Sequence, residues 1–145
     1  ILHITAADLD KDGYYIGSTD VSAEFDGSIE IAADLGRVVF KTSIRAKYSI
    51  RAMSHSGIEA GFDIKAGLGI EAGRGIEAGL SIVGVWISAR LRVFAGLCAW
   101  RLPDESEMEI RAELRGGIIA FGTHVPPTAA SVAEPAGDAP PQATE

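Results

Sequence analysis

The sequence has a single cysteine, Cys98, so it cannot form an internal disulfide, which fits a reducing compartment. It also lacks an apolar run that could span a membrane, because the longest stretch without Asp, Glu, Lys or Arg, residues 116–133, contains Pro126 and Pro127. No GK[ST] phosphate-binding loop and no His spacing typical of a metal site is present. We therefore expect a cytoplasmic protein with no membrane association, no bound metal and no cofactor.

What the sequence does have is an uneven distribution of charge. Its 145 residues carry a net charge of −7 and are 47% hydrophobic, which suits one folded domain. Residues 1–34 hold eight acids and one base, residues 35–101 hold ten bases and four acids, and residues 102–145 hold eight acids and two bases. Either the acidic segments pair with the basic middle, or separate charged faces stay available to a partner.

An internal repeat dominates the middle of the chain. From Ser43 it reads SIRAKY, SIRAMS, GIEAGF, DIKAGL, GIEAGR, GIEAGL and SIVGVW, with His55 and Ser56 inserted after the second hexad. The isoleucines recur at positions 44, 50, 58, 64, 70, 76 and 82. Six residues advance a helix by about 600°, which scatters the isoleucines around it, whereas an even period keeps them on one side of a strand.

Short strands that are joined by corners and stacked on one another form a β-solenoid. We therefore predict an all-β fold, a single-stranded parallel β-solenoid (β-helix) built on a six-residue repeat. In one hexad Ile64, Ala66 and Leu68 share a parity and should face inward, while the residue after each isoleucine should face outward. The glycine after each alanine allows a sharp corner, including one with positive φ; these glycines are Gly61, Gly67, Gly73 and Gly79.

The number of hexads in one coil determines which residues stack on one another. Three hexads per coil place Glu59 over Glu77, which is a like-charge pair, whereas two place Lys65 over Glu77. Charge alone does not decide between these arrangements. We favour three hexads per coil, because a six-residue period is more common in three-sided coils.

The segments on either side of the repeat predict irregular ends. Turn signals at Asp12-Gly13 and Asp26-Gly27 indicate either an irregular first coil or a small capping sheet. After the repeat, alternating apolar and polar residues predict further strands. We divide the chain into an acidic N-terminal β cap, the hexad-repeat solenoid, C-terminal β strands, and a disordered Pro- and Ala-rich tail, over residues 1–42, 43–88, 89–124 and 125–145.

The hexads resemble those of the hexapeptide-repeat, left-handed β-helix proteins, many of which are acyltransferases. That family prefers a small residue four positions after the aliphatic one, and this chain instead has Phe62, Leu68, Arg74 and Leu80 there. The hexads are also similar to those of bactofilins, which are bacterial β-helical polymers. Over residues 13–125 the chain resembles uncharacterised bacterial and phage-associated proteins with GIxAG arrays, a stretch like LRVFAGLCAWRLP and a closing stretch like IAFGT. This last resemblance implies no established activity.

Two short patterns are candidates for chemistry. The run Asp8-x-Asp10-x-Asp12-Gly13 matches the start of a calcium loop, but its twelfth position is Thr19 rather than Glu, so we interpret it as an acidic turn. His55 stands where the rhythm of the hexads breaks, which predicts a surface loop at a corner. In an acyltransferase such a histidine would act as general base, because imidazole titrates near neutrality. We assign His55 no catalytic role.

Two further features have a structural interpretation. Cys98 lies in a mostly apolar run, which predicts a buried thiol. Phe40 and Tyr48 interleave with an uninterrupted basic stretch, as on a nucleic-acid-binding surface; its bases are Arg37, Lys41, Arg45, Lys47 and Arg51. The acidity of the whole chain argues against direct nucleic-acid binding, so we interpret this stretch as a solvated or internally paired face.

We predict a non-enzymatic protein-interaction module, a rigid charged β-solenoid that binds a protein partner with a basic surface. Because regularly spaced carboxylates imitate phosphates, one specific form is an inhibitor of a nucleic-acid-binding enzyme or a host-defence complex, of the phage anti-defence or DNA-mimic type. The alternatives are a self-assembling, homo-oligomeric scaffold similar to bactofilins and a hexapeptide-repeat acyltransferase. The candidate interaction surface comprises Asp8, Asp10, Asp12, Asp20, Glu24, Asp26, Arg45, Arg51, Glu59, Lys65, Glu71 and Glu77.

Overall fold

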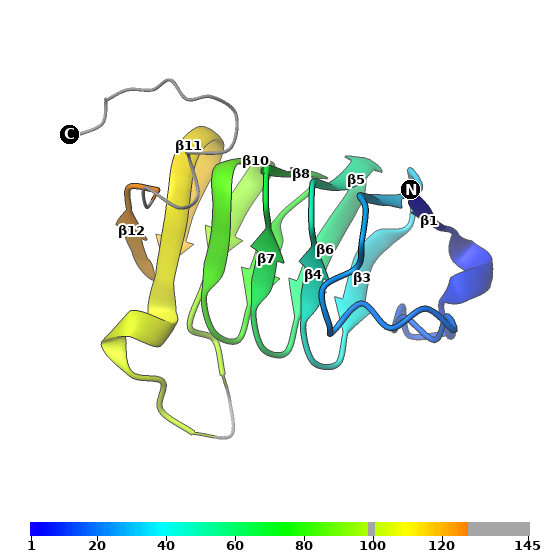
Figure 1. Ribbon diagram of the computed structural model, residues 1–145, viewed down its shortest axis with the longest axis horizontal. Coiled ribbons are helices and arrows are strands. Elements are labelled where there is room, and N and C mark those ends of the chain that lie inside the picture. The colour runs from blue at the N-terminus through cyan, green and yellow to red at the C-terminus, as the bar shows by residue number, and fades with distance from the viewer. Residues whose placement is uncertain (99–100, 128–145) are drawn as a thin grey trace.

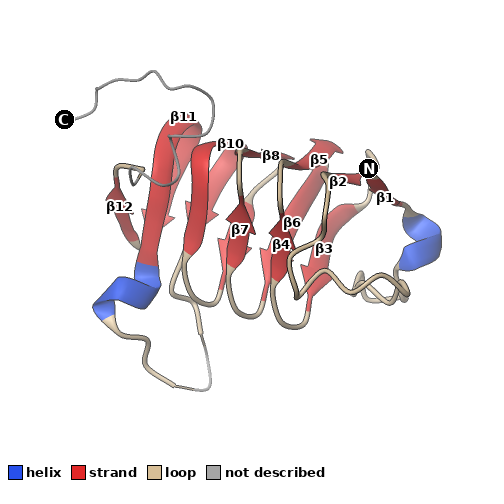
Figure 2. Ribbon diagram, in the orientation of Figure 1, coloured by secondary structure: helices blue, strands red, loops and turns tan. Residues whose placement is uncertain are grey.

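The computed structural model describes residues 1–98 and 101–127 and shows an all-β protein with parallel strands in one curled, solenoid-like sheet (Figure 1). Strands and loops make up nearly all of it, with two short 3-10 helices (Figure 2). In chain order the elements are β1 (Leu2–Ile4), η1 (Ala6–Asp8), β2 (Ile29–Ile31), β3 (Gly36–Phe40), β4 (Ile44–Ala46), β5 (Ile50–Ser54), β6 (Ser56–Ala60), β7 (Ile64–Ala66), β8 (Gly69–Gly73), β9 (Ile76–Ala78), β10 (Ile82–Phe94), η2 (Glu105–Met108), β11 (Glu109–Phe121) and β12 (Thr123–Val125).

The strands pair in three columns, which we call the first, second and third faces. The first face contains β1, β2, β5, β8 and residues 86–89 of β10, paired in that order. The second contains β3, β6, β9 and residues 93–94 of β10. The third contains β4, β7 and residues 82–83 of β10. Each turn of the chain thus contributes one segment to each face, and Glu59 lies opposite Glu77, as three segments per coil require.

Isoleucines fill the space between the three faces. The seven isoleucines of the sequence repeat are all at most 1% exposed. They lie in register along the columns, for example Ile44 beside Ile64 on the third face and Ile50 beside Ile70 on the first. Each fully buried isoleucine favours the folded state by about 1.5–3 kcal/mol relative to an exposed one, so these columns form the core.

The prediction that the sixth residue of each hexad faces inward is wrong. Phe62 is 38% exposed and Leu68 is only half-buried. Both follow the last residue of a strand, since β6 ends at Ala60 and β7 at Ala66. These side chains therefore lie at corners, where the alternation of a strand no longer decides their direction.

The predicted corner glycines are needed for space and not for positive φ. None of the four, Gly61, Gly67, Gly73 and Gly79, has a positive φ. A Cβ at Gly61 would overlap the carbonyl oxygen of Lys41 in the preceding coil, and one at Gly67 would overlap that of Lys47. The glycines allow successive coils to approach closely at these corners.

The N-terminal segment is an irregular first coil, which was one of the two alternatives for it. After β1 on the first face, Tyr14 forms a parallel bridge with Val39 of β3, and Phe25 forms one with Ala46 of β4. The chain thus passes along the same three faces, but it forms no regular strand on the second and third. η1 lies beyond β1 at this end of the sheet, and the loop that follows it runs back beside β3 and β4 (Figure 1).

The two long strands at the other end each bend around the molecule. β10 passes from the third face over the first to the second, and β11 follows it along its length. Because β10 bends, Leu91 is 48% exposed although it shares its parity with the buried Ile87. β12 pairs with the beginning of β11. The disordered tail predicted for residues 125–145 lies, from residue 128 onward, outside the described residues.

Candidate interaction surfaces

The residues of the predicted interaction surface fall in four places. The six acids from Asp8 to Asp26 lie together at the N-terminal end, in the irregular segment of residues 5–28, which we call the acidic head. The other six residues form three pairs, one on each face. Arg51 and Glu71 are on the first face, Glu59 and Glu77 on the second, and Arg45 and Lys65 on the third.

Backbone amides hold several carboxylates of the acidic head in place. Asp8 caps η1 by accepting the N–H of Thr5 at 2.9 Å. One oxygen of Asp10 accepts the N–H groups of both Asp12 and Tyr14, each at 2.9 Å, so the calcium-like run is an Asx turn. Among the described residues, no group of three or more His, Cys, Asp or Glu side chains is placed to hold a metal ion.

These hydrogen bonds keep the head negatively charged. The backbone N–H of Tyr14 is the main cause that lowers the pKa of Asp10 below its usual value. The pKa of Asp20 is also lowered, mainly because it accepts hydrogen bonds from the hydroxyl and the N–H of Ser22. The amides stabilise the charged form of each carboxyl, so both stay ionised well below neutral pH.

Few bases neutralise the head. Two exposed ion pairs are present, from Lys11 to Asp12 and from Lys47 to Asp26, both at 3.7 Å. Exposed pairs at that distance contribute little to stability, and water screens them. The acidic head therefore folds against the basic middle through backbone hydrogen bonds, such as that from the N–H of Tyr15 to the carbonyl oxygen of Val39, but few of its carboxylates pair with bases. The head keeps an excess of negative charge.

On the first face, acids and bases alternate along the column. His3 lies beside Glu30 with 3.0 Å between Nδ1 and Oε1, and Glu30 lies in register with Arg51. Arg51 in turn donates to Glu71 of the next coil at 3.2 Å. The outward charges of this face thus pair along the axis of the sheet, in the manner of cross-strand pairs.

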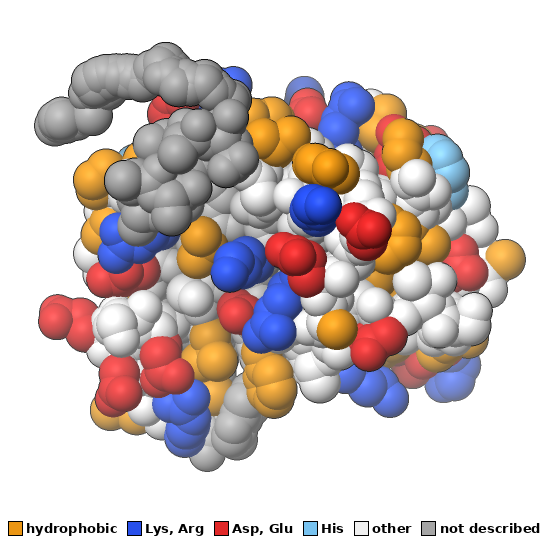
Figure 3. Space-filling model, in the orientation of Figure 1, with side chains coloured by type: hydrophobic (Ala, Val, Ile, Leu, Met, Phe, Trp, Pro, Cys, Tyr) orange, Lys and Arg blue, Asp and Glu red, His pale blue; other side chains and the backbone are white. Residues whose placement is uncertain are grey.

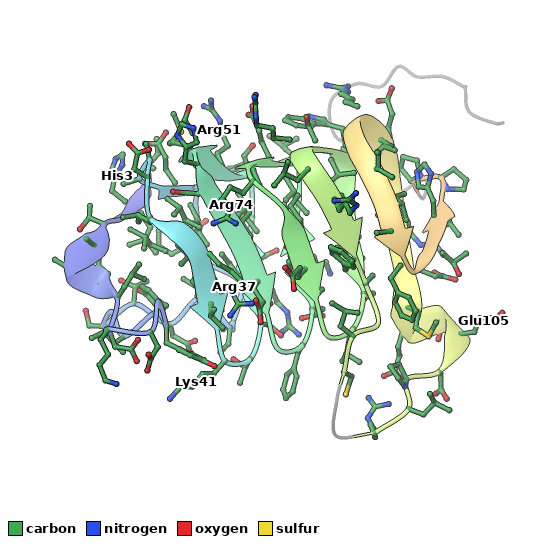
Figure 4. The ribbon with its side chains drawn as sticks, turned by 180° about the vertical axis from the view of Figure 1, so that it is seen from behind. His3, Arg37, Lys41, Arg51, Arg74 and Glu105 are labelled. Atoms are coloured by element: carbon green, nitrogen blue, oxygen red, sulfur yellow. The ribbon has the colours of Figure 1, made fainter. Side chains whose placement is uncertain are left out.

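The second face carries the like-charge pair that stacking predicts. Desolvation raises the pKa of Glu77, and the neighbouring carboxylate of Glu59 raises it further, while Arg37 and Arg74 oppose this. Arg37 Nε lies 3.0 Å from Oε1 of Glu59, but that buried oxygen accepts no hydrogen bond. Figure 4 shows Arg37 and Arg74 over the same side of the sheet. The two arginines partly offset the repulsion between the glutamates.

On the third face, the arginine is paired and the lysine is not. Arg45 donates to both oxygens of Asp63 at 3.1 and 3.2 Å and to the carbonyl oxygen of Ser22 in the head. Lys65, beside it in register, is exposed and has no ion pair within 4.0 Å among the described residues. In Figure 3, acidic and basic side chains are interspersed over the middle of the visible surface.

The basic stretch predicted from the sequence is not one surface. Arg37 lies on the second face, Arg45 on the third and Arg51 on the first, because successive strands of the coil belong to different faces. Phe40 is 2% exposed and belongs to the core, so it cannot stack on a nucleic acid base. Tyr48 is exposed, with the ammonium group of Lys47 5.6 Å from the centre of its ring.

His55 occupies the single-residue corner between β5 and β6, with φ of 64°. Its Nδ1 lies 2.9 Å from the carboxylate of Asp34, which has the corresponding corner position in the preceding coil and a φ of 62°. Both side chains are largely exposed. A shallow groove beside them is lined by Arg51, Ser88 and Arg90, among others.

Cys98 is half-buried, so the prediction of a buried thiol is wrong.

One candidate surface, at the C-terminal end, was not predicted from the sequence. At the C-terminal end, Ile118 is 64% exposed and Phe121 is 45% exposed, and both belong to β11. The sequence predicts a strand over residues 118–121, but alternation does not show whether another strand pairs with its edge.

Comparison with known proteins finds no matching family model, no matching curated protein and no matching solved structure. None of these comparisons identifies the hexapeptide-repeat, bactofilin or phage-associated proteins that the sequence resembles. In the described part of the chain, no helix is long and apolar enough to cross a membrane.

Proposed function

We propose that this chain is a non-enzymatic protein-interaction module whose acidic head binds a basic surface on a partner protein. The observation that supports this proposal is the charge of the head, where residues 5–28 hold six acids and one base. Three of the six carboxylates, those of Asp8, Asp10 and Asp20, are oriented by backbone N–H groups. Fixed charges lose little conformational freedom when a partner binds, which favours affinity.

We propose further that the six-residue repeat is the structural unit that supports the head. Every isoleucine of the repeat is buried, and the strands that carry them are in register from coil to coil. Close-packed columns of this kind resist deformation. The head is therefore presented on a firm support at one end of the molecule.

A more specific form of the proposal is that the head competes with nucleic acid for an enzyme or a host-defence complex. Carboxylates that stay charged and hold fixed positions act on a basic groove as phosphates do. Binding of this kind weakens as salt is added, because the basic groove has its own counterions and the charges are screened. The partner would thus be a nucleic-acid-binding protein with a positively charged site.

The test compares two triple variants of the full chain as baits in a lysate of a plausible host at low salt. In the first, D12N/E24Q/D26N, three charges of the head are removed while the turn-forming Asp8, Asp10 and Asp20 are kept. In the matched control, E105Q/E134Q/D138N, three charges are removed far from the head in the sequence. Captured proteins are then assayed for binding to duplex DNA and to RNA, with and without the chain.

We expect the wild type and the control variant to capture the same protein, and the head variant to bind it at least about tenfold more weakly at low salt. That protein should bind nucleic acid, and the chain should displace the nucleic acid. Equal capture by both variants would show that the head is not the binding surface. A captured protein that binds nucleic acid equally well in the presence of the chain would exclude competition.

A further inference from the structure

A shallow groove of about 480 Å³ runs along the first face, beside the corner with the second. Its lining comes from successive coils, with Arg51 on β5, Glu71 on β8 and Arg90 where β10 leaves the first face. Small residues such as Ala72 and Gly73 line it between these charged side chains. Two arginines and one glutamate give the lining a net positive charge, although the chain as a whole is acidic.

Arg90 contributes a charge that no described residue neutralises. Its side chain is exposed, and among the described residues no carboxylate lies within 4.0 Å of it. Its backbone is fixed, because its N–H donates to the carbonyl oxygen of Arg74 at 3.1 Å. The guanidinium group is therefore available to a ligand, while the strand that carries it is held in place.

Arg51 is only partly committed to its neighbour. Its Nε donates to Oε1 of Glu71 at 3.2 Å, whereas its two terminal nitrogens donate to no described residue. The side chains of Arg51 and Glu71 are 49% and 45% exposed, and an ion pair as exposed as this contributes little to stability. An anion of higher charge can therefore compete with Glu71 for this guanidinium group.

His55 is held beside the groove by a strained corner. Its φ of 64° is uncommon for a residue with a side chain, and glycine would adopt it without strain. The contact of 2.9 Å between Nδ1 and the carboxylate of Asp34 fixes the direction of the ring. Among the described residues Nε2 has no partner, and His55 lines the groove. The corner thus presents one ring nitrogen to a ligand.

Two hydroxyl groups add to these donors. Ser54 at the end of β5 and Ser88 on β10 line the groove, and the hydroxyl of neither bonds to a described residue. Donors from three coils therefore surround the groove, with Glu71 as the one carboxylate in its lining. Donors that come from several directions match a tetrahedral oxyanion, and arginine binds phosphate oxygens with paired hydrogen bonds. A phosphate monoester offers three strong acceptor oxygens and a higher charge than a carboxylate.

We propose that this groove binds a phosphate monoester group, whose oxygens accept hydrogen bonds from Arg51, Arg90, Ser54 and Ser88. His55 lies between Asp34 and the phosphate, and its protonated ring donates to both. The group belongs either to a small molecule or to a phosphorylated side chain, and both sources present the same oxygens. This site lies outside the acidic head and does not rest on the function proposed for it.

Amide NMR titration of the full chain at low salt and about pH 7.5 tests this, because the monoester is then largely a dianion. The two phosphate probes are glycerol phosphate and a capped glycine-rich peptide with one phosphoserine. Amides from Arg51 to His55 and from Ser88 to Arg90 should shift and saturate, with a Kd of about 1 mM or below. Glycerol and the unphosphorylated peptide should cause no shift. Equal affinity for both phosphate probes indicates a small-molecule source, and tighter binding of the peptide indicates a phosphorylated side chain.

Three single variants locate the site. R90Q should weaken binding about tenfold, because a hydrogen bond to a charged group is lost. R92Q is the matched control, because Arg92 is also exposed and without an ion pair among the described residues but does not line the groove. It should bind as the wild type does. E71Q should strengthen binding about threefold, because it removes a negative charge from the groove and releases Arg51.

A fourth variant, H55G, removes the ring and keeps the corner, because glycine adopts the positive φ. It should weaken binding while circular dichroism and thermal unfolding show an intact fold. The proposal is overturned if neither phosphate probe gives saturable shifts, if R90Q and R92Q weaken binding equally, or if acetate binds as tightly as glycerol phosphate. The head variant D12N/E24Q/D26N should bind the phosphate probes at least as well as the wild type, so this test and that of the head fail independently.

Discussion

The two ends of this molecule meet the same physical problem in different ways. A stack of parallel strands must end twice, and each end exposes unpaired backbone groups and the last residues of the core. At the N-terminal end the chain covers Ile4 with irregular turns that are held by aspartate side chains. At the C-terminal end the last long strand, β11, has Leu114 and Ile119 partly exposed. The irregular coil covers the core at its end, whereas the last long strand leaves part of the core exposed.

The largest difference between the ends should appear when core residues are truncated. Ile4→Ala should lower the free energy of unfolding by about 3 kcal/mol, because it leaves a cavity in a covered core. Ile119→Ala should cost about 1 kcal/mol, because its side chain is already partly in water. Both are measured by urea denaturation. Equal losses would show that the two ends are packed equally well.

A second difference concerns how each end holds its carboxylates. Two hydrogen bonds from Arg101, both 2.8 Å long, are the main cause that lowers the pKa of Glu107 to about 2. At the other end, a backbone amide is the main cause of the lowered pKa of Asp10. Because both pKa values are lowered in the folded state, each carboxylate stabilises the fold above its unfolded pKa. That contribution is lost as the pH falls through the folded pKa.

Salt separates these two mechanisms. In high salt the pKa of Glu107 should rise toward its ordinary value, because an exposed ion pair is screened, while that of Asp10 should change less. R101Q should raise the pKa of Glu107 in the same direction and leave Asp10 unaffected. Carboxyl carbon NMR titrations at low and high salt measure both residues in one experiment. Equal shifts at the two sites would contradict the distinction.

The smallest effect is expected in the middle of the sheet, which provides a reference for both ends. Because the pKa of Glu77 is raised in the folded state, its carboxylate disfavours folding at neutral pH, and that penalty disappears as the pH falls through the folded pKa. Glu77→Gln should therefore raise stability at pH 7 by no more than a few tenths of a kcal/mol, because water screens this partly exposed group. Thermal unfolding at pH 7 and pH 4 measures it, and the gain should vanish at the lower pH.

The buried columns could be predicted from the sequence because the alternation of a strand is a local property. Ile44, Ile64 and Ile82 could be placed in the core without knowing which strands lie beside them. The corners could not be predicted in this way. Leu68 follows the inward parity and yet lies at a corner, and Gly67 is needed because of the carbonyl of Lys47, a residue twenty positions earlier that only the coiled chain brings close.

The candidate surfaces were harder to predict, because the charge of a residue does not show on which face of the sheet it lies. Arg45 and Arg51 are neighbours in the repeat but lie on different faces, a separation that follows directly from three strands per coil. The acidic head was predictable, since its six acids are close in sequence. The C-terminal edge was not recognised, because alternation identifies a strand over residues 118–121 but does not show whether another strand pairs with it.

The register of the strands has a consequence for how the chain acquires its structure. Ile44 pairs with Ile64 and Ile50 with Ile70, so the partners in these columns are twenty residues apart. Closing a loop of that length costs little entropy and is fast, and each new coil needs only the one made just before it as a template. Synthesis on the ribosome delivers the coils in that order, so we expect growth from the N-terminal end during translation, with unravelling under tension in the reverse order.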